Sequence, residues 1–553
     1  MTAAGTTSGH DGDPGGDAGL LSASVIDALT HWFDRDAPVA RSISYAVFDR
    51  RGILFEHAIG EADASGALPR RDTVYRIASL SKSFQAAAVL LLRDRGLLTL
   101  DDRLSAHVPQ FTDPVDRAGV VLPVTVRMVL SNCSGLPEDN GWADHEMGMA
   151  REEFLALVAR GLAFTERPGD GYQYSNIGFW LLGILVENVS GREFADLVAS
   201  ELLEPLGLTG TRYRVTDYAA DGVGGGIAQG FSTVDRGRTW SARPVVGSGV
   251  GACAASLFST LPDIARWSSW LGSAFDPENA DDAILSRASR REMQRGSTTI
   301  PAGPLQPASP HLASAAYGLG LVVEQDERFG TLVQHSGGLP GWSANMRWHP
   351  ASGIGVAVFA NTDGVRAAVP AAAMLRAVLV DLDLPAREIA LLPSTLAAAR
   401  AVEDAIVRFG DVAAPGAAAL FSPNLLSDVP ADVRRERLSA ALAEVGGLDE
   451  ARGAAPLTER MLWSASAAQL TFLLPGRTGD LECRIELTPT EPALVQRLVI
   501  EERDPASANA SVVRHYRPVD GSHPRDEALS GSSPADEARG PFTDDSASGV
   551  DLG

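Results

Sequence analysis

Lysine is almost absent from this 553-residue chain, because 46 of its 47 basic residues are arginine and Lys82 is the only lysine. Arginine stays protonated at any working pH, whereas lysine can release its proton when burial or a neighbouring cation lowers its pKa. A single lysine in a chain that otherwise uses arginine therefore indicates a position where a proton is exchanged.

Clustered positive charge is also missing, because 70 acidic residues outweigh the basic ones and give a net charge of −23. Nucleic acids and anionic membrane surfaces bind proteins through such clusters, so we expect neither as a partner. No stretch approaches the roughly 20 uncharged apolar residues of a membrane-spanning helix. The first 19 residues lack the basic start and apolar core of a secretory signal. We therefore predict a cytoplasmic protein.

Cysteine is scarce, and its three copies, Cys133, Cys253 and Cys483, lie far apart. An odd number of distant cysteines makes neither a disulfide framework nor a close-spaced zinc site. His145 is likewise not followed by a second histidine at the spacing of a zinc-protease helix. We expect each cysteine to be a small buried hydrophobic residue, and we expect the protein to use no metal and no other cofactor.

Three further features do not rise to a functional signal. The glycine-rich segments 221–230 and 247–256 lack both the Gly-Lys-Ser/Thr ending of a phosphate loop and the G-x-G-x-x-G of a dinucleotide fold. We expect flexible or close-packed backbone there, bordering a cleft. Ser134 has no lysine or histidine near it in sequence, so we expect it to cap a turn rather than act as a nucleophile.

The length predicts two to three domains, and the hydrophobic pattern divides the chain into four parts. These are a disordered N-terminus at 1–20, a main domain at 21–388, a small α+β accessory domain at 389–517 and a disordered acidic tail at 518–553. The accessory domain is predicted from amphipathic helices followed by meandering strands.

The main domain combines strands at both ends with a helical middle. A hairpin is predicted over 42–63, a helix over 79–96, short strands within 315–362 and a closing helix over 365–382. This order predicts an α/β (α+β) domain in which an antiparallel sheet is flanked by helices and carries an all-helical lobe.

Ser79 stands three residues before Lys82, in "RIASLSKSF". Three residues are about one helical turn, so both side chains lie on one face. There a lysine amine that shares its proton can activate a serine hydroxyl as a nucleophile. A serine at a helix N-terminus also has free N–H groups and a positive dipole where an oxyanion would form.

Two further patterns lie later in the chain. "YSN" supplies Tyr174, as a phenolate-type base, and Asn176, as a hydrogen-bonding orienter, at the entry to an apolar helix. "HSGG" supplies His335 at the end of a predicted strand, followed by small residues that let a substrate backbone lie alongside. Each pattern is weak alone, but together they predict one site.

With these three motifs the sequence resembles the serine hydrolases that include class C β-lactamases, serine D-alanyl-D-alanine carboxypeptidases, D-aminopeptidases and β-lactamase-like esterases. The stretches "GLLTLDDRLSAHVPQF", "MVLSNCSGLP", "YSNIGFWLLGILVENVSGREF", "LLEPLGLTGTRY" and "HSGGLPGW" are also similar to that family. The resemblance covers roughly residues 25–385 and leaves out the C-terminal domain.

The resemblance implies a role for each motif residue. Ser79 would be the acyl nucleophile, Lys82 its activator, Tyr174 the proton shuttle and Asn176 the group that orients Lys82 and the substrate amide. The third motif implies His335 as a catalytic residue, where many relatives have lysine, and Ser336, Gly337 and Gly338 as substrate-binding residues. The oxyanion hole would be the N–H groups of Ser79 and Gly338.

The resemblance implies hydrolysis of a small molecule or short peptide and leaves several activities open. Histidine at position 335 offers a cation to a substrate carboxylate only conditionally, which favours an ester, amide or D-aminoacyl peptide. The alternatives are a β-lactamase or D-alanyl-D-alanine carboxypeptidase and, from another class, a catalytically silent penicillin-binding or sensing module. The oligomeric state stays open.

Overall fold

A computed structural model describes residues 20–34, 38–218, 226–301, 311–384, 391–409 and 418–503. The described residues form two compact units, of which the first ends at Leu384 and the second holds every element from α13 to β16. The predicted disordered segments, apart from Leu20, lie outside the described residues, as does the predicted boundary at residue 388.

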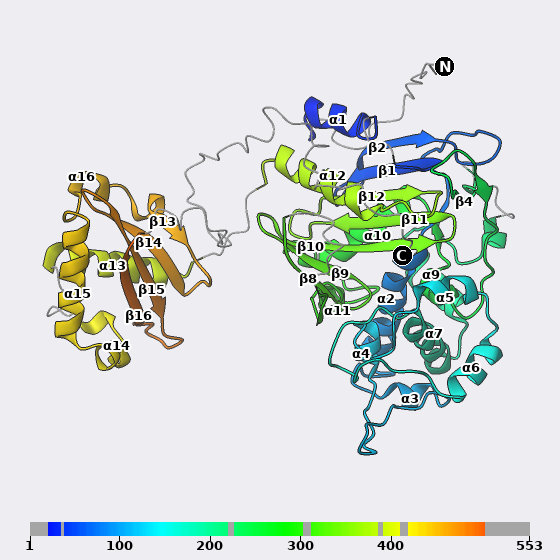
Figure 1. Cartoon of the computed structure of the whole chain (residues 1–553), viewed down its shortest axis with the longest axis horizontal. Coiled ribbons are helices and arrows are strands. Elements are labelled where there is room, and N and C mark those ends of the chain that lie inside the picture. Colours follow the sequence, from blue (N-terminus) through cyan, green and yellow to red (C-terminus); the bar gives the residue numbers. More distant parts are fainter. Residues whose placement is uncertain are drawn as a thin grey trace. The chain divides into compact units, whose positions relative to one another are not determined.

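The first unit is built on an eight-stranded sheet with the order β2-β1-β12-β11-β10-β9-β8-β7 (Figure 1). Its strands are β1 (Ser42–Phe48), β2 (Ile53–Gly60), β7 (Thr298–Thr299), β8 (Leu312–Tyr317), β9 (Val322–Asp326), β10 (Gly330–Leu339), β11 (Trp342–Trp348) and β12 (Gly355–Ala360). Pairing is antiparallel from β2 through β10 and from β9 to β7. The predicted antiparallel sheet is thus confirmed.

One predicted strand pair forms as expected, and one predicted strand is interrupted by a turn. The hairpin over 42–63 is confirmed, and its turn closes through the N–H of Asp49, which donates to the carbonyl of Gly52 at 2.9 Å. The segment 315–326 is not continuous, because a turn around Gly320 separates β8 from β9. Gly320 has a φ of +68°, and a Cβ there would lie 2.6 Å from the carbonyl oxygen of Lys82. Glycine is needed where the turn presses against this helix.

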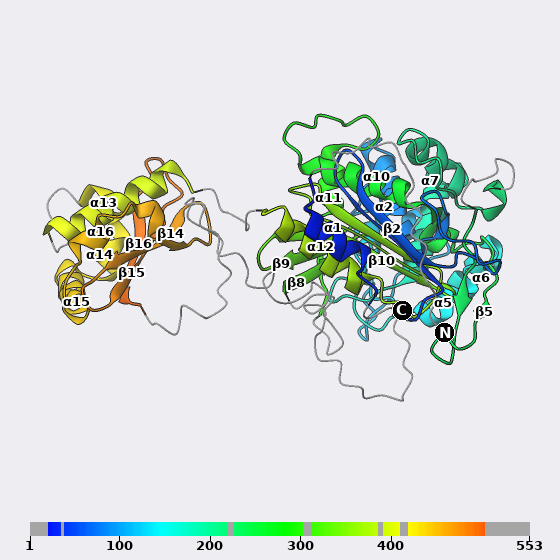
Figure 2. The same cartoon turned by 90° about the horizontal axis from the view of Figure 1, so that it is seen from above.

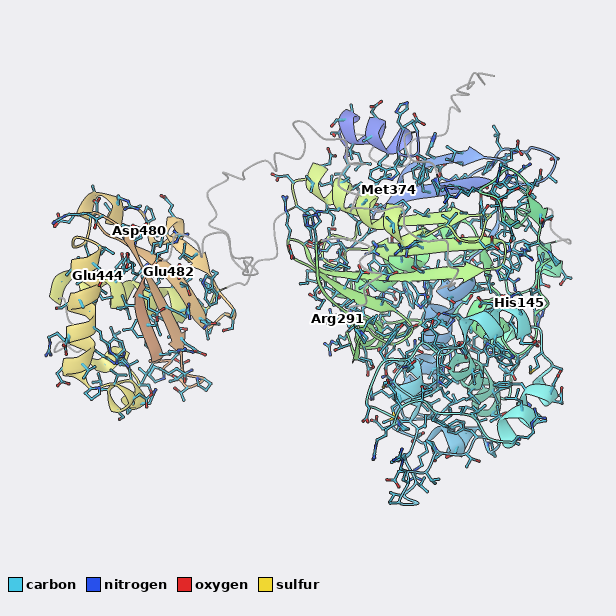
Figure 3. The ribbon with its side chains drawn as sticks, viewed as in Figure 1. His145, Arg291, Met374, Glu444, Asp480 and Glu482 are labelled. Atoms are coloured by element: carbon cyan, nitrogen blue, oxygen red, sulfur yellow. The ribbon has the colours of Figure 1, made fainter. Side chains whose placement is uncertain are left out.

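Helices cover both faces of the sheet. Helices α1 (Ala23–Thr30) and α12 (Ala368–Asp381) pack on one face, and α10 (Leu261–Gly272) packs on the other (Figure 2). Met374 of α12 is fully buried against the sheet (Figure 3). The main domain is therefore a layered α/β structure with its core on both sides of β1, β11 and β12.

Helix α2 (Ser81–Asp94) is the central helix, because every residue from Ser81 to Leu92 is buried. A helix that is buried all round belongs inside a core rather than on a surface. Phe84 stacks on Trp267 of α10 with ring centroids 3.8 Å apart. The prediction placed the helix start at Ser79, whereas α2 begins two residues later after a 3-10 turn over Ala78–Leu80.

The other side of α2 faces the predicted helical lobe (Figure 1). The remaining helices of the first unit are α3 (Leu104–His107), α4 (Val126–Leu130), α5 (Asn140–Glu146), α6 (Arg151–Ala159), α7 (Asn176–Ser190), α8 (Phe194–Val198), α9 (Ala252–Ala255) and α11 (Arg287–Met293). Two short ribbons, β3 (Tyr75–Arg76) with β6 (Phe258–Ser259) and β4 (Phe231–Ser232) with β5 (Ser241–Ala242), complete it. Helix α7 packs on both α2 and α9, which brings the second motif to the first.

The second unit is a four-stranded antiparallel sheet with helices, which agrees with the α+β pattern of amphipathic helices followed by strands. It contains α13 (Pro393–Phe409), α14 (Pro423–Asp428), α15 (Ala431–Glu444), α16 (Glu450–Gly453), β13 (Met461–Trp463), β14 (Gln469–Pro475), β15 (Asp480–Leu487) and β16 (Val495–Glu502). Alternate residues of β15 from Leu481 to Leu487 are buried, so one face of the sheet covers the core.

Two smaller predictions concern cysteine and membrane spans. Cys253 and Cys483 are buried and Cys133 is partly buried, and all three are free thiols. Within the described ranges, every helix is too short or too polar to cross a bilayer.

Candidate active site

The first two motifs meet at the amine of Lys82. Its Nζ donates to Ser79 Oγ at 2.9 Å, to Asn176 Oδ1 at 2.7 Å and to the carbonyl of Ala254 at 3.5 Å. Lys82 comes from α2, Asn176 from the first turn of α7 and Ala254 from α9. Three separate elements thus hold the amine beside the serine hydroxyl. Ala254 lies in the glycine-rich segment 247–256, so this segment contacts Lys82, and its place beside a cleft stays a prediction.

Ser79 stands on a strained turn. The preceding Ala78 has a φ of +49°, a left-handed conformation that costs a non-glycine residue roughly 1–2 kcal/mol. The turn is held because Ser81 Oγ donates to the Ala78 carbonyl at 2.6 Å and accepts from the N–H of Leu257 at 3.2 Å. This conformation places Ser79 at the open end of α2, and the sequence carries no signal for it.

Burial controls the charge of Lys82, whose side chain is fully buried. Desolvation lowers the pKa of its amine to about 8, while the negative charges of Asp144 and Asp139 oppose that shift. The Nζ also lies 4.9 Å from the ring centroid of Tyr174. A pKa of about 8 allows the amine to gain and lose a proton near neutral pH, while proton exchange in a reaction stays a prediction.

Asn176 is held by a carboxylate that the sequence analysis missed. Asp139, just before α5, accepts hydrogen bonds from the backbone N–H groups of Asn176 and Ile177, both at 2.8 Å, and from Asn176 Nδ2 at 3.1 Å. Asn140 Oδ1 accepts a second bond from Asn176 Nδ2 at 2.8 Å. Because Nδ2 is fixed by these acceptors, Oδ1 must face Lys82. An Asp-Asn pair following "SGLPE" has no sequence signature of its own.

Tyr174 lies two residues before α7, packed against the amine of Lys82. Burial raises the pKa of its phenol well above the ordinary value, and the neighbouring Ser79 hydroxyl is the largest effect in the opposite direction. The phenol is therefore the stable form in this environment. The raised pKa does not favour the predicted phenolate-type base.

His335 lies within β10, opposite Met346 of β11, and is buried. Its Nε2 is 2.9 Å from the hydroxyl of Tyr317, and its Nδ1 is 2.6 Å from the carbonyl of Ser336. Desolvation, together with the nearby positive charge of Lys82, lowers the pKa of His335 to about 3. This environment favours the neutral ring over the conditional cation that the sequence predicted.

The rest of the third motif lies along the same strand. A Cβ at Gly337 would lie 2.3 Å from the Ile77 carbonyl and 3.1 Å from the Ala78 Cβ, so β10 touches the turn that carries the serine. A Cβ at Gly338 would meet nothing within 4 Å. Ser336 is exposed, and its Oγ accepts from Asn345 Nδ2 at 3.0 Å. Strand β9 has five residues and its neighbour β10 has ten. The second half of β10, which carries the third motif, therefore extends beyond the end of β9.

Asp144, which the sequence analysis also missed, interacts electrostatically with both Lys82 and Arg76. Burial raises the pKa of Asp144 to about 6, against the positive charges of Lys82 and Arg76. Asp144 stands one helical turn after Asn140, which touches the site, so both lie on one face of α5. Arg76 is buried and donates to Ser256 Oγ at 3.1 Å.

Ser134 and His145 were expected to have no catalytic or metal-binding role. The Ser134 Oγ accepts from the N–H of Leu136 at 3.4 Å, which is the predicted turn cap. His145 of α5 is exposed (Figure 3). Within the described part of the chain, no three His, Cys, Asp or Glu residues converge as metal ligands.

An antiparallel sheet with helices on both faces, a helical lobe and a serine one turn before a buried lysine define the β-lactamase and transpeptidase class of fold. The sequence profile of the Beta-lactamase family matches residues 34–380, and the chain belongs to that family. The predicted resemblance is therefore confirmed.

Among curated proteins, the chain is similar to Penicillin-binding protein 4* of Bacillus subtilis, with 27% identity over 53% of this chain and 62% of that protein. It is similar to Protein flp of Staphylococcus aureus, with 26% identity over 52% of this chain and 53% of that protein. The matches thus span little more than half the length of these relatives.

Solved structures share the fold at low identity. An octameric penicillin-binding protein homologue from Pyrococcus abyssi covers 88% of this chain and 99% of its own, with a TM-score of 0.53 and 18% identity. The hydrolase EstCE1, described with promiscuous acyltransferase activity, covers 65% of this chain and 98% of its own, with a TM-score of 0.52 and 18% identity.

Proposed function

We propose that the protein is a serine hydrolase that acts through an acyl-enzyme on Ser79, with an ester, amide or D-aminoacyl peptide as substrate. The observation that carries this proposal is the 2.9 Å contact between Lys82 Nζ and Ser79 Oγ, made by an amine whose pKa is about 8. Membership of a family that consists mostly of serine hydrolases supports it.

The first half of the reaction acylates the serine. The neutral Lys82 amine takes the proton of Ser79, and the oxygen attacks the substrate carbonyl to form a tetrahedral oxyanion. The N–H groups of Ser79 and Gly338 stabilise that charge. Lys82 returns the proton through the Tyr174 phenol to the leaving group, and the carbon–oxygen or carbon–nitrogen bond breaks.

The second half releases the acyl group. A water molecule gives one proton to Lys82 and attacks the ester carbonyl, and the proton then returns to Ser79 as its bond to the acyl carbon breaks. Asn176 holds the Lys82 amine in position during acylation and deacylation, because its Oδ1 accepts a hydrogen bond from Lys82 Nζ at 2.7 Å. The products are a carboxylic acid and the alcohol or amine.

The substrate class follows from the third motif. A substrate carboxylate beside the scissile bond needs a permanent cation, and the buried His335 has a pKa of about 3. This argues for substrates that are uncharged or cationic at that position and against β-lactams and C-terminal D-alanyl peptides, which remain the second candidate. The relatives named as penicillin-binding proteins are the observation in favour of that candidate.

A serine-directed fluorophosphonate probe tests the nucleophile. We expect one label per wild-type chain, located by peptide mass on Ser79, and none on Ser79→Ala. Ser134→Ala is the matched control, because its hydroxyl only caps a turn, and it should label as wild type. Equal labelling of Ser79→Ala and wild type would overturn the assignment.

A panel of substrates distinguishes an ester or amide hydrolase from a β-lactamase and from a silent penicillin-binding module. We expect turnover of p-nitrophenyl esters and D-aminoacyl anilides to exceed turnover of nitrocefin. A stoichiometric burst with nitrocefin or penicillin and no turnover of any ester or amide would instead indicate a silent penicillin-binding module. The cytoplasmic location stays a prediction, in keeping with the free thiols of all three cysteines.

A further inference from the structure

Tyr317, the last residue of β8, lines the site beside the third motif. It is fully buried, and its hydroxyl is 2.9 Å from His335 Nε2. Its ring centroid lies 6.2 Å from that of Tyr174, in an edge-to-face arrangement, and 6.0 Å from that of Tyr172. Tyr317 thus connects the sheet, the loop before α7 and the histidine.

The hydrogen bonds of His335 determine which of its ring nitrogens carries the proton. A backbone carbonyl only accepts, so Nδ1, at 2.6 Å from the Ser336 carbonyl, must carry a hydrogen. In a neutral ring Nε2 is then an acceptor, and the Tyr317 hydroxyl donates to it. Both ring nitrogens are therefore occupied within the protein, and neither is left for a substrate.

The surroundings hold both groups neutral. Burial raises the pKa of Tyr317 well above its ordinary value, so its hydroxyl remains a donor. Of the residues that the structure describes, the titratable side chains that interact with His335 are Lys82 of α2, Tyr174 before α7 and Tyr317 of β8, and Tyr172 packs on Tyr317. Among the described residues, Lys82 is the one charged side chain that shifts the pKa of His335, and its positive charge disfavours a second cation.

We infer that Tyr317 is a positioning residue that holds His335 as the neutral Nδ1–H tautomer. The side chain that the third motif offers to the substrate is then uncharged. Tyr317 thereby acts as a specificity determinant, since it selects against a carboxylate beside the scissile bond. This selection rests on the proposed hydrolase function, whereas the tautomer does not.

Imidazole nitrogen NMR tests the tautomer without any turnover. We expect the wild-type protein to show one histidine, assigned by its loss in His335→Gln, that stays in the Nδ1–H form from about pH 8 down to about pH 5. In Tyr317→Phe the Nε2 loses its donor, and we expect this histidine to titrate at a higher pH than in wild type. An Nε2–H tautomer in wild type, or an unchanged titration in Tyr317→Phe, would overturn the inference.

A matched substrate pair tests the selection. Two p-nitrophenyl esters that differ by one carboxylate near the carbonyl are compared in wild type and in Tyr317→Phe. We expect Tyr317→Phe to raise the kcat/KM ratio of the carboxylate ester over the neutral ester, and to raise it more at pH 5.5 than at pH 8, because a larger fraction of His335 is protonated at the lower pH.

Tyr45→Phe is the control, because Tyr45 is also buried with a bonded hydroxyl, to the Leu29 carbonyl at 2.6 Å, but lies away from the site. It should leave the substrate ratio unchanged. If Tyr317→Phe lowers kcat/KM equally for both esters, Tyr317 has a merely structural role, and the proposed selection against a carboxylate is refuted. Absence of ester turnover in wild type would count against the proposed function alone, since the nitrogen spectra would still report the tautomer.

Discussion

Replacing Lys82 by arginine keeps the positive charge and removes the exchangeable proton. If Lys82 accepts the serine proton, the rate of acylation is proportional to the fraction of molecules with a neutral side chain at position 82. With a pKa of about 8, roughly one amine in eleven is neutral at pH 7. A guanidinium with a pKa of about 12.5 is neutral in only ~3 molecules per million. We therefore expect Lys82→Arg to acylate up to about 10⁴-fold more slowly, since burial at this position lowers the pKa of a cation and reduces the factor.

The second variant controls for packing, because arginine is larger than the fully buried lysine it replaces. Lys82→Met matches the volume, removes the proton acceptor and avoids burying an amine, so it should fold well and remain inactive. For both variants, stopped-flow acylation by a p-nitrophenyl ester is measured from pH 6 to pH 10 beside a thermal melt.

The pH profile distinguishes the proposed base from its alternatives. In wild type, acylation should rise with pH, level off above the Lys82 pKa of about 8 and therefore be weak near pH 6. The reasoning is refuted if folded Lys82→Arg or Lys82→Met acylates within tenfold of wild type. A wild-type profile that is flat across pH 8 would also contradict a base with this pKa.

Two further predictions concern the surroundings of the catalytic pair. Asp144→Asn removes a negative charge that raises the pKa of Lys82, so the rise of kcat/KM with pH should move to lower pH; an unmoved or opposite shift would show that the carboxylate does not act on the amine. Gly337→Ala would place a Cβ 2.3 Å from the Ile77 carbonyl, and we expect a loss of ~1–3 kcal/mol in stability together with loss of acylation. Gly338→Ala has open space around its Cβ and should melt as wild type, so equal melting of the two variants would contradict the close approach of β10.

The sequence was sufficient to predict those parts of the site that depend on local spacing. Ser79 and Lys82 are three residues apart, so their contact was predictable from the spacing, although Ser79 lies in a 3-10 turn before α2 and not in the predicted helix. The contact of Asn176 with Lys82 spans 94 residues, and the family resemblance, not the spacing, supplied it. The antiparallel sheet was predictable because its strands have regular hydrophobic patterns.

The remaining features depend on tertiary surroundings that no local pattern encodes. The strained φ of Ala78 exists because neighbouring segments hold the turn. The low pKa of His335 comes from burial, and its occupied nitrogens depend on Tyr317, a residue in a different strand. In the sequence, Tyr317 was visible only as part of a strand pattern.

Asp139 offers a test of how far Asn176 depends on its support. Its carboxylate accepts from two backbone N–H groups at 2.8 Å and from Asn176 Nδ2 at 3.1 Å. Asp139→Asn turns one acceptor oxygen into an NH₂ group that faces donors, and we expect a loss of ~2 kcal/mol in the free energy of unfolding, the usual cost of losing a hydrogen bond to a charged group. Because Asn176 also directs Lys82, kcat should fall by more than tenfold even below the melting temperature. Ser175→Ala is the matched control, since its Oγ also bonds Asp139, at 3.3 Å, but does not touch Lys82. A variant that loses stability and keeps wild-type kcat would show that Asp139 only caps α7.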